Sequence, residues 1–204
     1  MPPGDGQDSE RSSKEAARLR RFLRFSHIFS ASVQEVVGEG YLSESSDHPL
    51  SLSQLHLLKL IADDGGYKVS DAAALLGISS PAATKCIDKL ERLGLIARTP
   101  CRTDRRATML NASDDGRTLV REYERVQQQR LMSLIGDFSP LEVDRLTDLL
   151  ERFAVALFER SGSERSSCLR CAGYVEDDCA IARVRGSCPY QKLRANSSTE
   201  MGIS

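Results

Sequence analysis

The stretch Lys68–Asn111 reads KVSDAAALLGISSPAATKCIDKLERLGLIARTPCRTDRRATMLN and decides the fold. Residues with helical spacing occupy Ser70–Leu76 and again a segment from about Ser80 to Leu93. Gly77 stops the first segment and Gly94 follows the second, which is where glycine commonly ends a helix. Two short helices joined by a tight turn predict a helix–turn–helix. Its second helix can project into a DNA major groove about 12 Å wide.

A basic hairpin follows the second helix directly. Leu95–Thr99 and Ala107–Asn111 are expected to be short strands, joined by the segment Pro100–Arg106. The arginine side chains of this tip would pack poorly in a protein core, but they suit the negative potential of a DNA minor groove. The order helix, turn, helix, strand, basic tip, strand therefore predicts a winged helix–turn–helix within a mainly α fold.

Positive charge is concentrated in this region. Residues 68–106 hold eight basic and four acidic side chains, a balance of +4, whereas the whole chain has 28 basic and 29 acidic residues and a net charge of −1. This excludes a globally basic, histone-like protein but leaves room for a local DNA-binding face. The alternative is a generic helical segment with a solvated basic face. The candidate DNA contacts are hydroxyls, lysines and the charged residues of the wing: Ser79, Ser80, Thr84, Lys85, Lys89, Arg102, Asp104, Arg105 and Arg106.

Amphipathic helices are expected on both sides of this head, from about Lys14 to Val37, from about Ser113 to Leu134 and from Ser139 to Arg160. The apolar stripes of the first and the last predict dimerisation, with packing inside one chain as the alternative. A two-fold dimer would set two DNA half-sites about one helical turn apart, roughly 34–36 Å. The predicted division of the chain is 1–13 disordered, 14–48 an N-terminal dimerisation helix and loop, 49–112 the winged helix–turn–helix DNA-binding domain, 113–160 the C-terminal dimerisation helices and 161–204 a cysteine-rich metal-binding tail.

The sequence resembles the MarR family of bacterial transcriptional regulators. The most specific parts are LERLGLIAR, the DRR of the wing and the pattern L-N-x-S-x-x-G-R that follows, within a resemblance covering about residues 15–160. It implies an obligate homodimer that binds a pseudo-palindromic double-stranded operator. It also implies that Ser80–Lys89 is the recognition helix, that Ser79 and Thr84 contact DNA, that Asp104 orients the wing and that Arg106 enters the minor groove. The start Pro81-Ala82-Ala83 departs from the family, in which larger side chains are common here.

Four of the six cysteines lie close together in the tail. They follow the spacing C-x2-C-x7-C-x8-C, which brings four thiolates into a short segment able to wrap a metal centre. The second pair is more widely spaced than in common zinc sites, and Pro189 after the last cysteine resembles the Cys-Pro of bacterial ferredoxin motifs. A 4Fe-4S iron–sulfur cluster is therefore the predicted cofactor, with zinc as the alternative and disulfides or unrelated thiols as further possibilities. The candidate metal ligands are Cys168, Cys171, Cys179 and Cys188.

The remaining two cysteines are expected to differ. Cys86 lies beside the packed stripe of the second helix and is expected to be a small, half-buried residue. Cys101 is expected to be exposed in the wing beside Arg102, where a cation could lower its pKa and support a redox switch.

The chain is 40% apolar and 28% charged, as in ordinary soluble proteins. It has no apolar run near the roughly 18 residues of a membrane span. The polar start MPPGDGQDSERSS is unlike a secretory signal, so we expect a cytoplasmic protein without a membrane partner.

These patterns predict a sequence-specific DNA-binding regulator, a repressor, whose affinity depends on the cysteine-bound centre and so on redox state, oxygen or iron. One alternative is a MarR-type regulator that responds to a small-molecule effector near His27, His56 and Tyr123 and has a structural zinc in its tail. Another is an iron–sulfur electron carrier or enzyme. We expect no enzyme, because the sequence shows no catalytic triad, glycine-rich phosphate loop or His-Glu-x-x-His motif.

Overall fold

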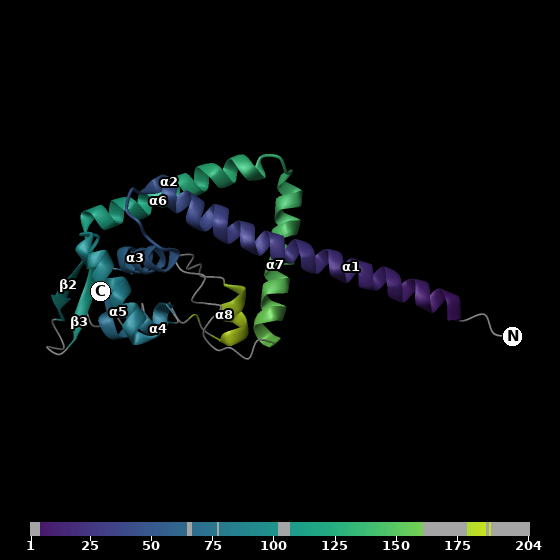
Figure 1. The fold of residues 1–204 in the computed structure, drawn as a ribbon, viewed down its shortest axis with the longest axis horizontal. Coiled ribbons are helices and arrows are strands. Elements are labelled where there is room, and N and C mark those ends of the chain that lie inside the picture. The colour runs from purple at the N-terminus through teal and green to yellow at the C-terminus, as the bar shows by residue number, and fades with distance from the viewer. Residues whose placement is uncertain are drawn as a thin grey trace.

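The computed structural model describes residues 5–64, 67–76, 78–101, 107–160, 179–186 and 188. Helices dominate, and one small antiparallel sheet accompanies them (Figure 1). The predicted fold class, a mainly α winged helix–turn–helix, is confirmed. The elements are α1 Asp5–Ser32, the π-helical η1 Val33–Gly40, α2 Tyr41–Ser45, α3 Leu52–Asp64, β1 Tyr67–Lys68, α4 Val69–Leu76, α5 Ser80–Arg92, β2 Ile96–Pro100, β3 Thr108–Ala112, α6 Asp114–Ile135, α7 Pro140–Arg160 and α8 Ala180–Arg185.

Helices α3, α4 and α5 and the three strands form one compact head. The strand order is β1-β3-β2, and both pairings are antiparallel. In the larger ladder Ile96 lies opposite Ala112 and Pro100 opposite Thr108, so β2 and β3 form the predicted hairpin. The two-residue strand β1 joins the free side of β3, with Tyr67 opposite Leu110.

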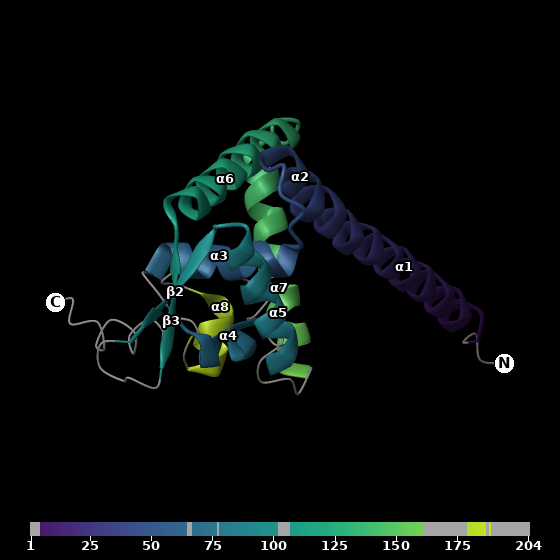
Figure 2. The ribbon, with the colours of Figure 1, turned by 60° about the vertical axis from the view of Figure 1, so that its left-hand side comes forward.

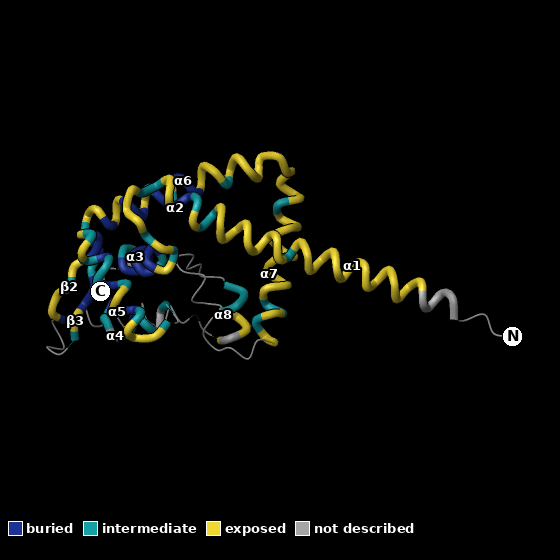
Figure 3. Tube along the Cα trace, in the orientation of Figure 1, coloured by how far each residue is buried: buried dark blue, intermediate teal, exposed yellow. Residues whose placement is uncertain are grey.

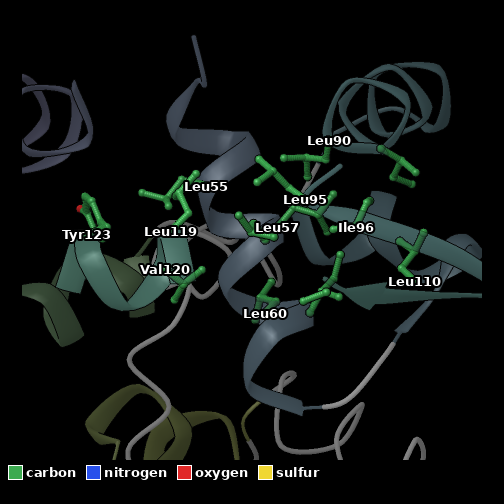
Figure 4. Close-up of a cluster of buried hydrophobic side chains, with 14 of the residues drawn as sticks. Leu55, Leu57, Leu60, Leu90, Leu95, Ile96, Leu110, Leu119, Val120 and Tyr123 are labelled. Carbon is green, nitrogen blue, oxygen red and sulfur yellow. The ribbon is translucent and has the colours of Figure 1, made fainter. Parts of the chain in front are cut away.

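The hydrophobic core lies between α3, α5, the sheet and the first half of α6. Side chains from all of these elements meet in Figure 4, including Leu55 and Leu60 of α3, Leu90 of α5, Leu110 of β3 and Val120 of α6. Leucines at helical spacing on α3 are fully buried, because this helix is covered on one side by α5 and the sheet and on the other by α6. The head therefore has its own core, which fixes α5 relative to the hairpin.

The turn after α5 sets the direction of the hairpin. The Leu95 N–H donates to the Leu90 carbonyl at 3.0 Å, and the Gly94 N–H donates to the Glu91 carbonyl at 2.9 Å. This is a Schellman motif, whose central residue must be left-handed, and Gly94 has φ +71°. The predicted helix stop at Gly94 therefore also supplies the bend that leads into β2.

We expect Gly94→Ala to lower the free energy of unfolding by about 1 kcal/mol, because a Cβ strains a left-handed residue. Thermal unfolding should show a midpoint about 2–4 °C lower. The control is Gly40→Ala, since Gly40 has an ordinary helical φ of −61°. An equal loss in both variants would contradict a special role for the turn.

Ser51 is the capping residue of helix α3. Its backbone N–H donates to Oε1 of Gln54 at 2.9 Å, and the Gln54 N–H donates to Oγ of Ser51 at 3.4 Å. This reciprocal pair is a capping box, which requires a Gln or Glu three residues after the cap. Ser51 has that partner.

Helices α1, α6 and α7 extend away from the head (Figures 1 and 2). The second half of α6 carries the chain outward, α7 returns beside the head, and α1 projects far beyond both. Most of α1 and α7 is exposed, in contrast to the buried centre of the head (Figure 3). None of the helices in the described part of the chain combines the length and the apolar character needed to cross a membrane.

Three parts of the structure differ from the sequence-based expectations. The expected disorder of residues 1–13 is wrong for 5–13, which belong to α1, while residues 1–4 lie outside the described part. The expected loop over 38–48 is mostly helical, because η1 and α2 continue α1 as far as Ser45. The strand β1 and the helix α8 were not expected, and both are too short to give a periodic pattern.

Candidate nucleic-acid interface

Helix α5 has one buried and one exposed face. Ala83, Ile87 and Leu90 are buried in the core of the head. The exposed face carries side chains that can reach a phosphate or a base edge: Ser79, Ser80, Thr84 and Lys85. The structure thus brings these four candidate DNA contacts together at the start of one helix.

The start of α5 suits the approach of a DNA strand. Ser79 precedes the helix in an extended conformation, and Pro81 occupies the first turn, where a missing N–H costs nothing. The Thr84 hydroxyl donates to the Ser80 carbonyl at 3.0 Å, so its oxygen remains able to accept a hydrogen bond. Lys85 is exposed beside it. Small and polar side chains here allow the helix backbone to come close to a partner.

Lys89, a further candidate contact, has an intramolecular partner. Its ammonium group donates to the backbone carbonyl of Pro49, in the connection between α2 and α3. Lys89 therefore ties the end of α5 to that connection, a contact that sequence reasoning did not suggest. Its predicted contact with DNA would require this hydrogen bond to be exchanged for one with a phosphate.

Arg98 links the hairpin to α5. From β2 its guanidinium reaches Asp88 at 2.5 Å and also pairs with Glu91. The hydrogen bond with Asp88, the largest influence, raises the pKa of Arg98 above its ordinary value. Two acidic side chains on the outer part of α5 are thus neutralised, which reduces the repulsion that DNA phosphates would meet. Sequence reasoning counted these three charges but did not pair them.

The wing begins at the end of the β2–β3 hairpin. The Cys101 N–H donates to the Ala107 carbonyl at 3.0 Å and closes the hairpin. The predicted contacts Arg102, Asp104, Arg105 and Arg106 lie outside the described residues. Their proposed roles therefore rest on the sequence.

The two cysteines of the head are not exposed thiols. Cys101 is buried, with 8% of its surface accessible, so the expectation of an exposed wing cysteine is wrong. A sequence pattern does not reveal this burial. Cys86 is half-buried as expected, and burial raises the pKa of its thiol. Raised pKa and burial both disfavour the reactive thiolate.

A polar cluster lies between α3 and α6. The ammonium of Lys59 is buried and pairs with Glu124 at 2.9 Å, and it lies 5.8 Å from the ring of Tyr123. Burial, followed by the charge of Lys59, lowers the pKa of His56. Thus His56 and Tyr123, two of the three residues proposed to line an effector site, both lie near Lys59, while His27 is exposed on α1. Lys59 itself was missed, because its helical stripe is otherwise apolar.

Two of the four tail cysteines lie in the described part of the chain. Cys179 directly precedes α8, Cys188 follows it, and both are half-buried with free thiols. Cys168 and Cys171 lie outside the described residues. Within the described residues alone, no three His, Cys, Asp or Glu side chains gather into a metal site.

The comparison with known proteins agrees with this geometry. Residues 50–108 match the MarR family. This segment runs from just before α3 to the start of β3 and so includes α5 and β2. The fold is therefore that of a MarR-type winged helix.

Solved structures of the same fold cover more of the chain. YusO from Bacillus subtilis is 23% identical with a TM-score of 0.56, over 68% of this chain and 96% of that chain. FabT from Streptococcus pneumoniae, solved in complex with DNA, is 19% identical with a TM-score of 0.59, over 68% and 98%. The heme sensor PefR from Streptococcus agalactiae, solved in complex with heme, is 21% identical with a TM-score of 0.51, over 69% and 97%. The likeness thus extends beyond the MarR-type head.

Proposed function

We propose that the protein is a MarR family transcriptional repressor that binds a pseudo-palindromic DNA duplex as a homodimer. The observation that carries the proposal is the exposed start of α5, where Ser79, Ser80, Thr84 and Lys85 share one surface beside the base of the hairpin. Hydroxyls and a lysine at a helix start supply phosphate and base-edge contacts in a major groove. FabT, a protein of the same fold, was solved in complex with DNA, which supports a DNA-binding role.

The homodimer accounts for an unusual amount of exposed apolar surface. Large apolar side chains along α1, the end of α6 and α7 are open to solvent, far beyond the isolated exposed residues of a monomer. We propose that a second copy of this chain covers this surface. The exposed helices come from both ends of the fold, and a two-fold axis pairs each of them with its equivalent in the partner. The most exposed of these residues are Leu19, Phe25, Met132, Leu134, Leu141, Leu149 and Leu157.

The test is selection from a pool of random DNA duplexes, followed by affinity measurements on the enriched sequence. We expect two related half-sites about one helical turn apart. With about 6–10 phosphate contacts, affinity should fall roughly 10³–10⁵-fold between 50 and 200 mM salt. Lys85→Ala should reduce the slope of log affinity against log salt by about 2, one for each copy. The control is Lys14→Ala on α1, where Lys14 pairs with Glu10 at 2.6 Å. Failure to enrich any sequence would overturn the proposal.

Arg98→Ala should weaken DNA binding about threefold to tenfold, or roughly 0.7–1.4 kcal/mol. The change leaves Asp88 and Glu91 without their guanidinium and turns two carboxylates toward the phosphates. Titration of the selected duplex by fluorescence anisotropy measures the loss. Arg121→Ala on α6 removes the same charge from an arginine that bonds Thr118, and it should bind as the wild type does. Equal losses in both variants would contradict the role of Arg98.

We further propose that Cys168, Cys171, Cys179 and Cys188 hold a 4Fe-4S cluster whose presence changes DNA affinity. The spacing of the four thiols supports the cluster, and the packing of Cys188 against the core of the head supports the coupling. Protein purified without oxygen should be brown, absorb near about 400 nm and contain iron and sulfide. Cys179→Ser should lose the colour while it still binds DNA.

A colourless protein with stoichiometric zinc would instead favour the second candidate, a regulator with a small-molecule effector and a structural zinc. The polar cluster of the buried Lys59 and Tyr123 with the half-exposed Glu124 favours that candidate, since polar groups in a largely apolar interior can orient a ligand. The heme complex of PefR shows ligand binding in a protein of this fold.

A further inference from the structure

Helix α7 has few contacts with the rest of the described chain. None of its described residues is buried, and Figure 3 shows it exposed along most of its length. The element against which it packs most extensively is α8. It also has a ring contact with α1, between Phe22 and Phe153, whose centroids lie 5.0 Å apart. Within the described chain, contacts with α8 and α1 therefore position α7.

The segment around α8 contacts both α7 and the head. Toward α7, Nη2 of Arg183 donates to Oε1 of Glu151 at 3.1 Å. Toward the head, Ile181 and Cys188 pack against the hydrophobic core cluster. Figure 1 shows α8 between α7 and α4 of the head. The bridging segment, defined as residues 179–186 with Cys188, thus contacts both α7 and the head.

The chain reverses within this segment. Gly186 follows α8 with φ +75°, a left-handed conformation that glycine adopts without strain. The reversal lets Ile181 and Cys188, on either side of the turn, reach the same core. Cys179 lies at the other end of the helix.

We propose that the bridging segment lets the tail control the head. When a bound centre holds Cys179 and Cys188, the segment fixes α7 against the head. When the centre is lost, α7 is released. The proposal rests on the proposed function, in which Cys179 and Cys188 are ligands of one centre. A centre bound at both ends of the segment holds α8 in place, and α8 holds α7. Since α7 belongs to the proposed dimer surface, its release changes the spacing of the two heads and so the fit to two DNA half-sites.

The test is hydrogen–deuterium exchange on the full chain without DNA, so its result does not depend on DNA binding. Arg183→Glu places two acids together and should speed exchange in α8 and in α7 around Glu151 about twofold to fivefold, as expected for an exposed ion pair. The double variant Glu151→Arg/Arg183→Glu restores opposite charges and should return exchange toward the wild-type rate. Ile181→Ala disturbs the contact with the head instead and should speed exchange in α8.

The same variants are then titrated with the selected duplex, before and after removal of the centre by an iron chelator. The proposal expects the affinity difference between these two states to shrink in Arg183→Glu and to return in the double variant. Unchanged exchange in Arg183→Glu and in Ile181→Ala would overturn the bridging role, whether or not the protein binds DNA. Faster exchange with no DNA binding by any variant would overturn the proposed function and leave the bridge standing. Faster exchange with no change in the affinity difference would overturn the control of the head.

Discussion

Gly116→Ala is expected to lower the free energy of unfolding by about 3 kcal/mol, the upper end for an overpacked site. A Cβ at Gly116 would lie 2.1 Å from the carbonyl oxygen of Leu95 and 3.1 Å from Cδ1 of Leu58. The nearer atom is backbone, so no side-chain rotation relieves the contact. Helix α6 would have to move away from the turn between α5 and β2.

The same carbonyl also anchors the start of α6. The Ser113 N–H donates to the Leu95 carbonyl at 3.0 Å, and the Gly116 N–H donates to Oγ of Ser113 at 3.0 Å. Displacement of α6 therefore disturbs its N-cap as well, and the roughly 1 kcal/mol that a cap contributes is part of this cost. Because Leu95 leads directly into β2, the hairpin should shift too, and DNA affinity should fall with stability.

Thermal and urea unfolding measure the effect, with an expected midpoint decrease of about 6–12 °C. Gly136→Ala is the matched control at the other end of α6. Gly136 has φ −61°, and a Cβ there would lie 3.3 Å from the Met132 carbonyl oxygen, so we expect a change within about 1 kcal/mol. Equal unfolding midpoints for the two variants would show that the backbone around Gly116 and Leu95 can shift at little energetic cost.

The head was largely predictable because its signals are local. The glycine after α5, the proline in its first turn and the alternation of the strands each depend on a few neighbouring residues. The element limits agree to about one residue: β2 is Ile96–Pro100 where Leu95–Thr99 was expected. The exposed face of α5 follows from the same periodicity.

The differences arise where residues far apart in the sequence determine a side chain's partner or its burial. Lys89 is free to bind DNA in the sequence pattern, but a carbonyl forty residues away, on Pro49, takes its ammonium group. Cys101 is next to charged residues in the sequence, yet it is buried in the fold. The start of α1 is too polar for a core, so its helix rests on pairs such as Arg11 with Glu15 rather than on packing.

The length of α8 explains why it was missed. Six residues give too little periodicity to separate a helix from a loop, and its helical state depends on contacts with α7 and the head. The cysteine spacing was visible in the sequence, but the proximity of Cys188 to the core of the head was not. The proposed coupling between the tail and the head therefore depends on the three-dimensional arrangement and could not be predicted from the sequence.

Leu146→Asp is expected to convert the dimer into monomers and to reduce DNA affinity by several orders of magnitude. On α7, Leu146, Leu150, Phe153 and Leu157 recur at helical spacing on one face, and Leu146 is 50% exposed in the single chain. The substitution therefore costs the folded monomer little. In a two-fold interface the lost burial counts twice, about 3–6 kcal/mol per dimer before the cost of two buried carboxylates. The dimer dissociation constant should rise about 10³-fold or more.

Sedimentation measures the oligomeric state, and titration of the selected duplex at several salt concentrations measures the consequence for DNA. A monomer holds one half-site and half of the phosphates, so the slope of log affinity against log salt should also be about half. Thr147→Asp adds the same charge at the neighbouring exposed position, where the only cost is the bond from Thr147 to the Val143 carbonyl at 2.9 Å, and it should remain a dimer. If Leu146→Asp also remains a dimer with the full salt slope, this face of α7 does not pair the two copies. The apolar surface on α1 and α6 would then have to form the interface without it.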